Sequence, residues 1–236
     1  MKAKMGFLEA SLQQEENRVE FLKELYDSGH TREAFLLCCC YIEGLGFSLY
    51  WPDSIISERP TFYFVKVLKD FGGEEVLWHV LPWTLLEAQR SPREGKRAGP
   101  ILAEIESELS NAKGEFYKED DILRLVAPCL SSKDLEWLRE RLWQATLAAF
   151  AYREIRSKFV HCLEAPFEAI NLTTKFKDMT LDPIDFSTFH RCLVRIMAVV
   201  RETTVRSGMW CGHDFKPAKP TSQRTNNRDD SWTNLI

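Results

Sequence analysis

The sequence predicts an all-α protein, an up-and-down helical bundle with short helices inserted between its long ones. Apolar residues recur at steps of three and four positions over most of the 236-residue chain. No stretch alternates between apolar and polar residues for long enough to indicate a sheet. The hydrophobic fraction of 44% and the charged fraction of 28% are typical of a folded chain and exclude collagen-like, mucin-like and wholly disordered classes.

The chain is expected to begin with two helices of different character. Over residues 8–26 apolar positions fall mostly at helical spacing among Glu, Gln and Lys, which predicts an amphipathic surface helix closed by Gly29. A second helix opens at Thr31, and its body over residues 34–50 is apolar almost all round. This pattern is typical of a central core helix, and Pro52 ends it.

Short helices and loops are expected in the middle of the chain. Gly72 and Gly73 separate two of the helices. The basic run over residues 90–100 contains proline and glycine, which predicts a loop and the best candidate for a boundary within the chain. The expected short helices are 62–71, 76–86, 101–109 and 121–130.

The longest expected helix runs over residues 133–159. Ser131 and Ser132 are placed to cap it, and acidic residues follow in its first turn. Its apolar residues repeat at alternating steps of three and four, which predicts the seam of a bundle helix. The seam residues are Leu135, Leu138, Leu142, Ala145, Ala149 and Tyr152.

A loop around residues 166–183 precedes the final expected helix, 185–206. We therefore predict one helical domain over residues 1–212, and the polar residues 213–236 are expected to form a disordered tail. One side of the final helix is apolar and carries Phe186, Phe189, Leu193, Met197 and Val200. Arginines occupy its other positions, namely Arg191, Arg195, Arg201 and Arg206.

Charge and cysteine content restrict the partners and the compartment. Thirty-one Lys and Arg against 35 Asp and Glu give a net charge of −4, which excludes a broad polyanion binder. Seven cysteines, three of them consecutive from Cys38 to Cys40 in an apolar run, predict reduced packing residues and a cytoplasmic protein. The first 11 residues lack the apolar stretch of a signal peptide. Residues 34–51 are barely long enough to cross a bilayer and contain Glu43, so we expect a buried helix and no membrane partner.

One spacing points to chemistry. The seam of the long helix ends in Arg156, and His161 follows five positions later. Burying an unpaired arginine is costly. The Arg156 side chain should therefore extend into solvent at the end of the bundle or line a polar cleft that binds an anion. The two side chains can meet only if the helix ends or bends near Phe159. A guanidinium holds phosphate and an imidazole transfers protons, so with the RNA 2′-hydroxyl as nucleophile no metal is required.

Other interpretations of these residue types stay open. Arg156 could pair with a carboxylate at the end of the bundle, and His161 could cap the last carbonyls of its helix. A second Arg–His pair, Arg206 and His213, lies where the fold gives way to the tail. The remaining cysteines and His213 match no zinc-binding spacing, so we expect neither a metal nor another cofactor. These zinc candidates are Cys162, Cys192, Cys211 and His213.

The stretch REIRSKFVHC, between a long helix and a terminal helix, resembles the signature of HEPN domains, which are all-helical bundles with an Arg and a His separated by four to six residues. CYIEGLGFSLYW and FYFVKVLKDFGG are similar to the core helix and the next helix of HEPN-like proteins of bacterial defence and toxin systems. The resemblance covers mainly residues 35–71 and 135–205. It implies a homodimer in which two copies of the motif meet in one cleft and cut RNA without a metal. It also implies that Arg156 contacts the scissile phosphate and that His161 transfers the proton.

The residues around the motif support two hypotheses of different class. Arg153 and Lys158 are cations that would extend a phosphate-binding track, and the arginines of the final helix belong to a helix that flanks the proposed cleft. Ser157, which can donate a hydrogen bond, stands where HEPN domains often have Asn, Asp or His. The leading hypothesis is an endoribonuclease in a toxin–antitoxin or phage-defence system, with an antitoxin or regulatory protein as a further partner. The alternative is a catalytically inactive HEPN-like module for dimerisation or partner binding.

Overall fold

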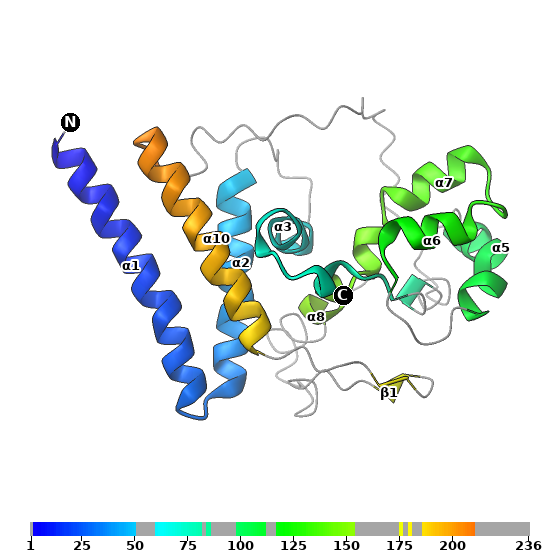
Figure 1. The fold of residues 1–236 in the computed structure, drawn as a ribbon, viewed down its shortest axis with the longest axis horizontal. Coiled ribbons are helices and arrows are strands. Elements are labelled where there is room, and N and C mark those ends of the chain that lie inside the picture. Colours follow the sequence, from blue (N-terminus) through cyan, green and yellow to red (C-terminus); the bar gives the residue numbers. More distant parts are fainter. Residues whose placement is uncertain are drawn as a thin grey trace. The chain divides into compact units, whose positions relative to one another are not determined.

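The computed structural model confirms the all-α class. Its described residues are mostly helical, and the strands among them are β1 (Lys175–Phe176) and β2 (Met179–Thr180), which have two residues each and pair antiparallel. They fall into two compact units: unit 1 comprises the described residues of Met1–Glu74 and Ala151–Lys219, and unit 2 those of Glu75–Phe150 (Figure 1). The described residues are 2–50, 60–81, 84–85, 98–111, 117–153, 175–176, 179–180 and 186–210.

The chain passes between the two units at Glu74–Glu75 and at Phe150–Ala151. The sequence prediction of one domain over residues 1–212, with a boundary candidate at 90–100, stays a prediction. The expected tail, residues 213–236, lies outside the described residues.

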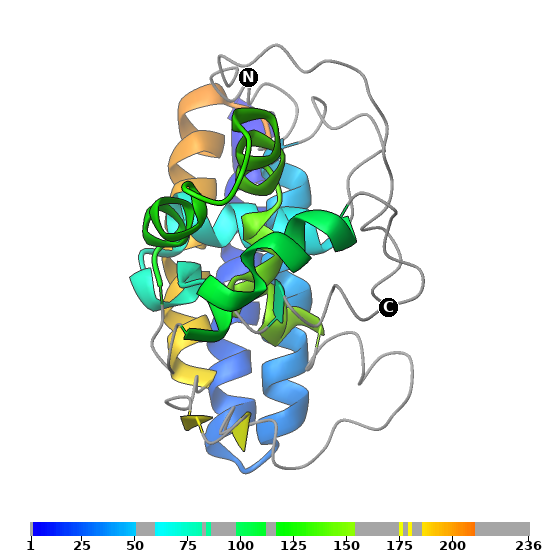
Figure 2. The same cartoon turned by 90° about the vertical axis from the view of Figure 1, so that its right-hand side faces the viewer.

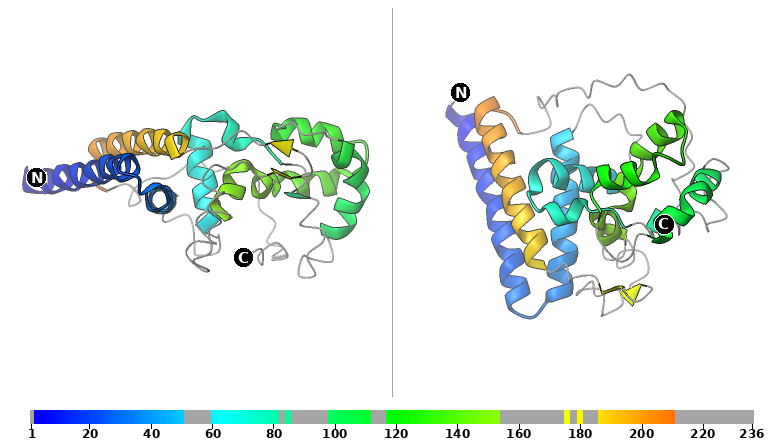
Figure 3. Two further views of the ribbon diagram at one scale, coloured as in Figure 1. Left: turned by 90° about the horizontal axis from the view of Figure 1, so that it is seen from below. Right: turned by 45° about the vertical axis from the view of Figure 1, so that its right-hand side comes forward.

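Long helices make up unit 1, much as the sequence predicted. The helices α1, α2 and α10 contact one another, and α3 packs on α2. Figure 2 shows the tight turn between α1 and α2, where Gly29 has a left-handed φ of 93°, and Figure 3 shows α10 beside α1. The elements are α1 (Lys2–Asp27), α2 (Thr31–Tyr50), α3 (Pro60–Val67), the π turn η1 (Leu68–Gly72) and α10 (Phe186–Ser207).

Aromatic rings form the centre of the unit 1 core. The Phe64 ring lies 4.9 Å from the Tyr152 ring and 6.0 Å from the Phe189 ring, measured between centroids. The Phe35 ring of α2 lies 5.2 Å from that of Phe189. All four side chains are buried. Their burial joins α2, α3 and α10 through apolar area removed from water.

The helix α2 is long and apolar enough to cross a membrane by length and composition. In unit 1 it is the core helix that the sequence predicted, because Phe35, Cys38 and Ile42 are fully buried on it. Gly46 lets α3 approach closely, since a Cβ there would lie 2.6 Å from the Tyr63 carbonyl oxygen.

Short helices around a separate core make up unit 2. Its core includes Leu102, Ile122, Trp137 and Leu138, which are all buried. Ser131 is the N-cap of α7, as predicted, and its Oγ accepts a hydrogen bond from the Asp134 amide at 3.2 Å. The elements are the 3₁₀ turn η2 (Glu75–Trp78), α5 (Ala98–Asn111), α6 (Glu119–Val126), α7 (Ser132–Arg139), the 3₁₀ turn η3 (Leu142–Ala145) and α8 (Leu147–Ala151), which ends in unit 1.

The prediction of a helix over residues 76–86 was wrong. The turn η2 forms at its start, Val80 pairs with both Tyr117 and Thr146 in antiparallel bridges, and helical backbone occurs again at Thr84 and Leu85. Val80 and Leu81 are buried in the non-helical part of this segment, and short apolar runs fit either structure.

The prediction of a single long helix over residues 133–159 was also wrong. Thr146 has an extended backbone with ψ of 157°, and it separates η3 from α8. The Leu81 amide donates to the Ala145 carbonyl at 2.8 Å, and the Leu147 amide donates to the His79 carbonyl at 2.9 Å. These bonds to a distant segment replace helical ones. The seam residues are buried or partly buried all the same, and they lie in α7, η3, α8 and the short π turn that follows α8.

Thr146 caps α8, and replacing it with valine should weaken unit 2. Its Oγ1 donates to the Trp143 carbonyl at 2.7 Å and accepts from the Ala149 amide at 3.3 Å. Thr146→Val keeps the shape and loses both bonds, so we expect the free energy of unfolding to fall by about 1–2 kcal/mol. Urea unfolding followed by circular dichroism measures this. The control is Thr203→Val within α10, a position that does not cap the start of a helix, and its change should stay within about 0.5 kcal/mol.

Candidate functional site

The predicted catalytic pair, Arg156 and His161, lies outside the described residues, as do Ser157 and Lys158. Arg153 is the one predicted site residue that the structure describes. It follows Tyr152 in a short π turn directly after α8, and its side chain is half-buried. The convergence of these residues in one cleft therefore stays a prediction.

Tyr152 lies just before the predicted motif, and its side chain is held by contacts with α2 and α3. Its hydroxyl donates to Glu43 Oε2 on α2 at 2.9 Å, and its ring packs on Phe64 of α3. Its side chain is buried, so the hydroxyl needs this acceptor. Arg153 therefore directly follows Tyr152, a residue whose side chain contacts both α2 and α3 of unit 1.

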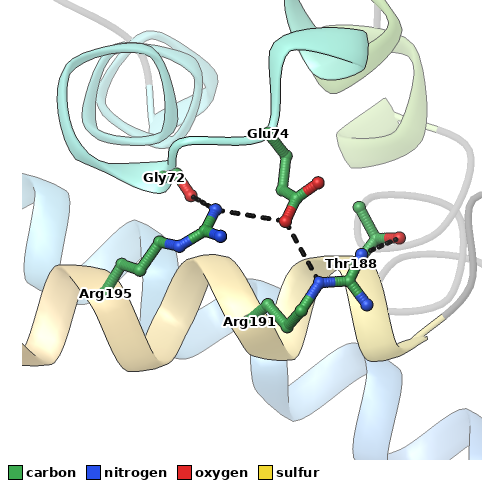
Figure 4. A network of polar contacts seen from close by, with 5 residues as sticks. All are labelled: Gly72, Glu74, Thr188, Arg191 and Arg195. Carbon is green, nitrogen blue, oxygen red and sulfur yellow. Dashed lines mark hydrogen bonds and ion pairs between the residues drawn. The ribbon is translucent and has the colours of Figure 1, made fainter.

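A cluster of opposite charges joins α10 to the end of η1, and we call it the Glu74 clasp (Glu74, Arg191 and Arg195). Arg191 Nε and Arg195 Nη1 each donate to Glu74 Oε1 at 3.1 Å, as Figure 4 shows. The two arginines are one helical turn apart, so both side chains reach the same oxygen. Hydrogen bonding from Arg191 lowers the pKa of Glu74 most, and the charges of both arginines add to the effect.

Each arginine of the clasp also has an uncharged acceptor. Arg195 Nη1 donates to the Gly72 carbonyl at 2.9 Å, and Arg191 Nη2 donates to Thr188 Oγ1 at 3.3 Å. Gly73 has a φ of 73°, and a Cβ at this position would lie 2.7 Å from Arg195 Nη1. Glycine at this turn therefore serves two purposes, the left-handed backbone and the close approach of the guanidinium.

The other arginines of α10 also face carboxylates. Arg201 Nη1 contacts both oxygens of Glu16 on α1, at 2.8 and 2.9 Å, and its Nη2 contacts Glu9. Arg206 Nη1 lies 3.8 Å from an oxygen of Glu202. The sequence interpretation placed these arginines on a helix that flanks the proposed cleft. In the part of the chain that the structure describes, their charges are balanced within unit 1.

Two cysteines are buried packing residues, Cys38 as the sequence predicted and Cys192, which was one of the zinc candidates. Cys38 and Cys192 are fully buried, and burial raises the pKa of Cys192 to about 12. Such thiols stay protonated at neutral pH and are poor nucleophiles and poor metal ligands. No group of three metal-binding side chains occurs among the described residues. The other zinc candidates, Cys162, Cys211 and His213, lie outside them.

Sequence reasoning missed the two carboxylates that organise these contacts. Glu74 was not singled out, because its partners on α10 lie 117 and 121 positions away. Glu43 was noted only as a charge within an apolar helix, yet it accepts from Tyr152 at a separation of 109 positions. Its position in an otherwise apolar helix was a signal, since a charge there needs a partner.

Comparison of the chain with protein-family models, curated proteins and solved structures gave no match. The resemblance to HEPN domains therefore rests on the residues that carry it.

Proposed function

We propose that the protein is a metal-independent endoribonuclease of the HEPN type, acting as a cytoplasmic homodimer in a toxin–antitoxin or phage-defence system. The observation that supports this proposal is the anchoring of Tyr152 by Glu43 and Phe64. The Arg–His motif begins four residues after this buried tyrosine. Catalysis by positioned side chains requires such a rigid support, because small displacements of a catalytic group reduce the rate strongly.

The chemistry follows from the two side chains. The 2′-oxygen of the ribose attacks the adjacent phosphorus, and the bond from phosphorus to the 5′-oxygen of the next nucleotide breaks. His161 of one protomer takes the 2′-hydroxyl proton, and a protonated imidazole gives one to the leaving 5′-oxygen. Arg156 balances the charge that develops on the phosphate oxygens. The products are a 2′,3′-cyclic phosphate end and a 5′-hydroxyl end.

Single substitutions at the motif test this proposal. We expect purified wild-type protein to cut RNA in excess chelator, and His161→Ala and Arg156→Ala to lower the cleavage rate about a hundredfold each. Gel analysis of labelled RNA measures the rate and identifies the cyclic phosphate end. The matched control is Arg139→Ala, which removes an exposed arginine paired with Glu136 on α7 and should keep the wild-type rate. Absence of cleavage by the wild type over a wide range of RNAs would contradict the proposal.

A second candidate function is a catalytically inactive module that dimerises or binds a partner protein. The pairing of Arg191, Arg195 and Arg201 with carboxylates favours it, because these charges are balanced within the chain. Ser157 in the motif favours it as well. Wild-type protein that forms a stable dimer and leaves every RNA intact would support this candidate.

A further inference from the structure

The Glu74 clasp has the geometry of an anion site that is already occupied. Two guanidiniums converge on one oxygen, Glu74 Oε1, from donors that each lie 3.1 Å away (Figure 4). Arginines are preferred for phosphate because their planar forks fit its oxygens. We propose that Arg191 and Arg195 form a binding site for a phosphate monoester or free phosphate, and that Glu74 is an internal ligand which the phosphate displaces. This site is independent of the proposed catalytic pair.

The arginines are held in place by more than Glu74. The Gly72 carbonyl holds Arg195, and the Thr188 hydroxyl holds Arg191. The guanidinium of Arg195 also packs on the backbone of Gly73. When the carboxylate leaves, these contacts keep the two donors pointing toward one place. A site organised in advance in this way loses less entropy on binding a ligand.

The ion pairs of the Glu74 clasp are only partly withdrawn from water. The side chains of Arg191 and Arg195 are about half exposed, with fractions of 52% and 48%, and that of Glu74 is 20% exposed, so water partly screens the pairs. A phosphate monoester carries a charge of about −1.5 to −2 at neutral pH, against −1 for the carboxylate, and it offers three oxygens. The exchange therefore favours phosphate over the internal carboxylate at sufficient concentration.

Glu74→Gln in the full chain tests whether the Glu74 carboxylate competes with phosphate for the two arginines. Removal of the negative charge that competes with phosphate for the two arginines should tighten phosphate binding about fivefold. Titration calorimetry with inorganic phosphate measures the affinity, and the arginine Nε–Hε resonances report whether Arg191 is the group that responds. The matched control is Glu16→Gln, which removes a carboxylate from Arg201 and should leave the affinity unchanged.

The arginines are tested by Arg191→Gln and by Arg195→Gln, each in the Glu74→Gln background. Either substitution should abolish the gain in affinity, and circular dichroism verifies the fold. A 5′-phosphorylated oligouridylate and the same oligomer without its phosphate separate the two sources of the ligand. Tighter binding of the phosphorylated oligomer than of phosphate assigns the site to an RNA end, and equal binding assigns it to free phosphate. An equal effect of Glu74→Gln and Glu16→Gln, or no phosphate binding by Glu74→Gln, would overturn the proposal.

Discussion

Phe64→Ala should lower the free energy of unfolding by about 3–5 kcal/mol. Phe64 is fully buried, and its ring contacts those of Tyr152 and Phe189, so truncation removes the contact between α3, α10 and the chain after α8. The space left behind is a cavity that packed neighbours fill only in part. The loss is a large fraction of the stability of a typical domain, about 5–15 kcal/mol. Urea unfolding followed by circular dichroism measures it.

Two further variants keep this prediction testable. Phe47→Ala removes the same side chain from α2, where the ring is 42% exposed, and should cost no more than about 1 kcal/mol. Phe64→Leu keeps most of the volume and should cost less than about 1.5 kcal/mol, so it folds even if the alanine variant does not. Similar losses for Phe47→Ala and Phe64→Ala would contradict the assignment of Phe64 to the core.

Gly46→Val should cost about 3 kcal/mol, because a side chain at this position has no space. Its Cβ would lie 2.6 Å from the Tyr63 carbonyl oxygen and 3.0 Å from Val67 Cγ1, so α2 and α3 must move apart. The backbone oxygen cannot rotate away as the end of a flexible side chain would. The change in melting temperature, measured by calorimetry, reports the loss.

Gly44→Val on the same helix is the matched control. A Cβ at Gly44 meets nothing within 4 Å, so the substitution should be neutral or stabilising by about 0.3 kcal/mol through helix propensity. The two glycines are two positions apart, and the sequence gives no reason to expect different outcomes. Equal effects of the two substitutions would show that α3 does not pack on α2 through Gly46.

Helices whose hydrogen bonds are internal were predictable from the sequence. The apolar face of α10 was predicted residue by residue, and Phe186, Phe189, Leu193, Met197 and Val200 are all buried. The core helix α2 and the capping role of Ser131 were also predicted. In these elements each residue bonds to a neighbour a few positions away, so composition and spacing contain the necessary information.

The failures share one physical cause. Around Thr146 the backbone forms hydrogen bonds with residues 79–81. These bonds to distant residues interrupt the continuous helix that the apolar pattern over residues 133–159 predicts. Periodicity still identified the buried positions there, because burial depends on the apolar side chains and not on which backbone bonds form. A seam of apolar residues therefore predicts a core without specifying one continuous helix.

By itself the sequence determined the all-α class, the long helices α1, α2 and α10 with their buried faces, and the Arg156–His161 motif on which the proposed function rests. Only the tertiary structure decided that Tyr152 is anchored by Glu43 and that the α10 arginines are balanced by carboxylates. The reason is that helical spacing is local, whereas a charge finds its partner through space. Glu74 and Arg195 are 121 positions apart in the chain, and the fold brings them to 3.1 Å.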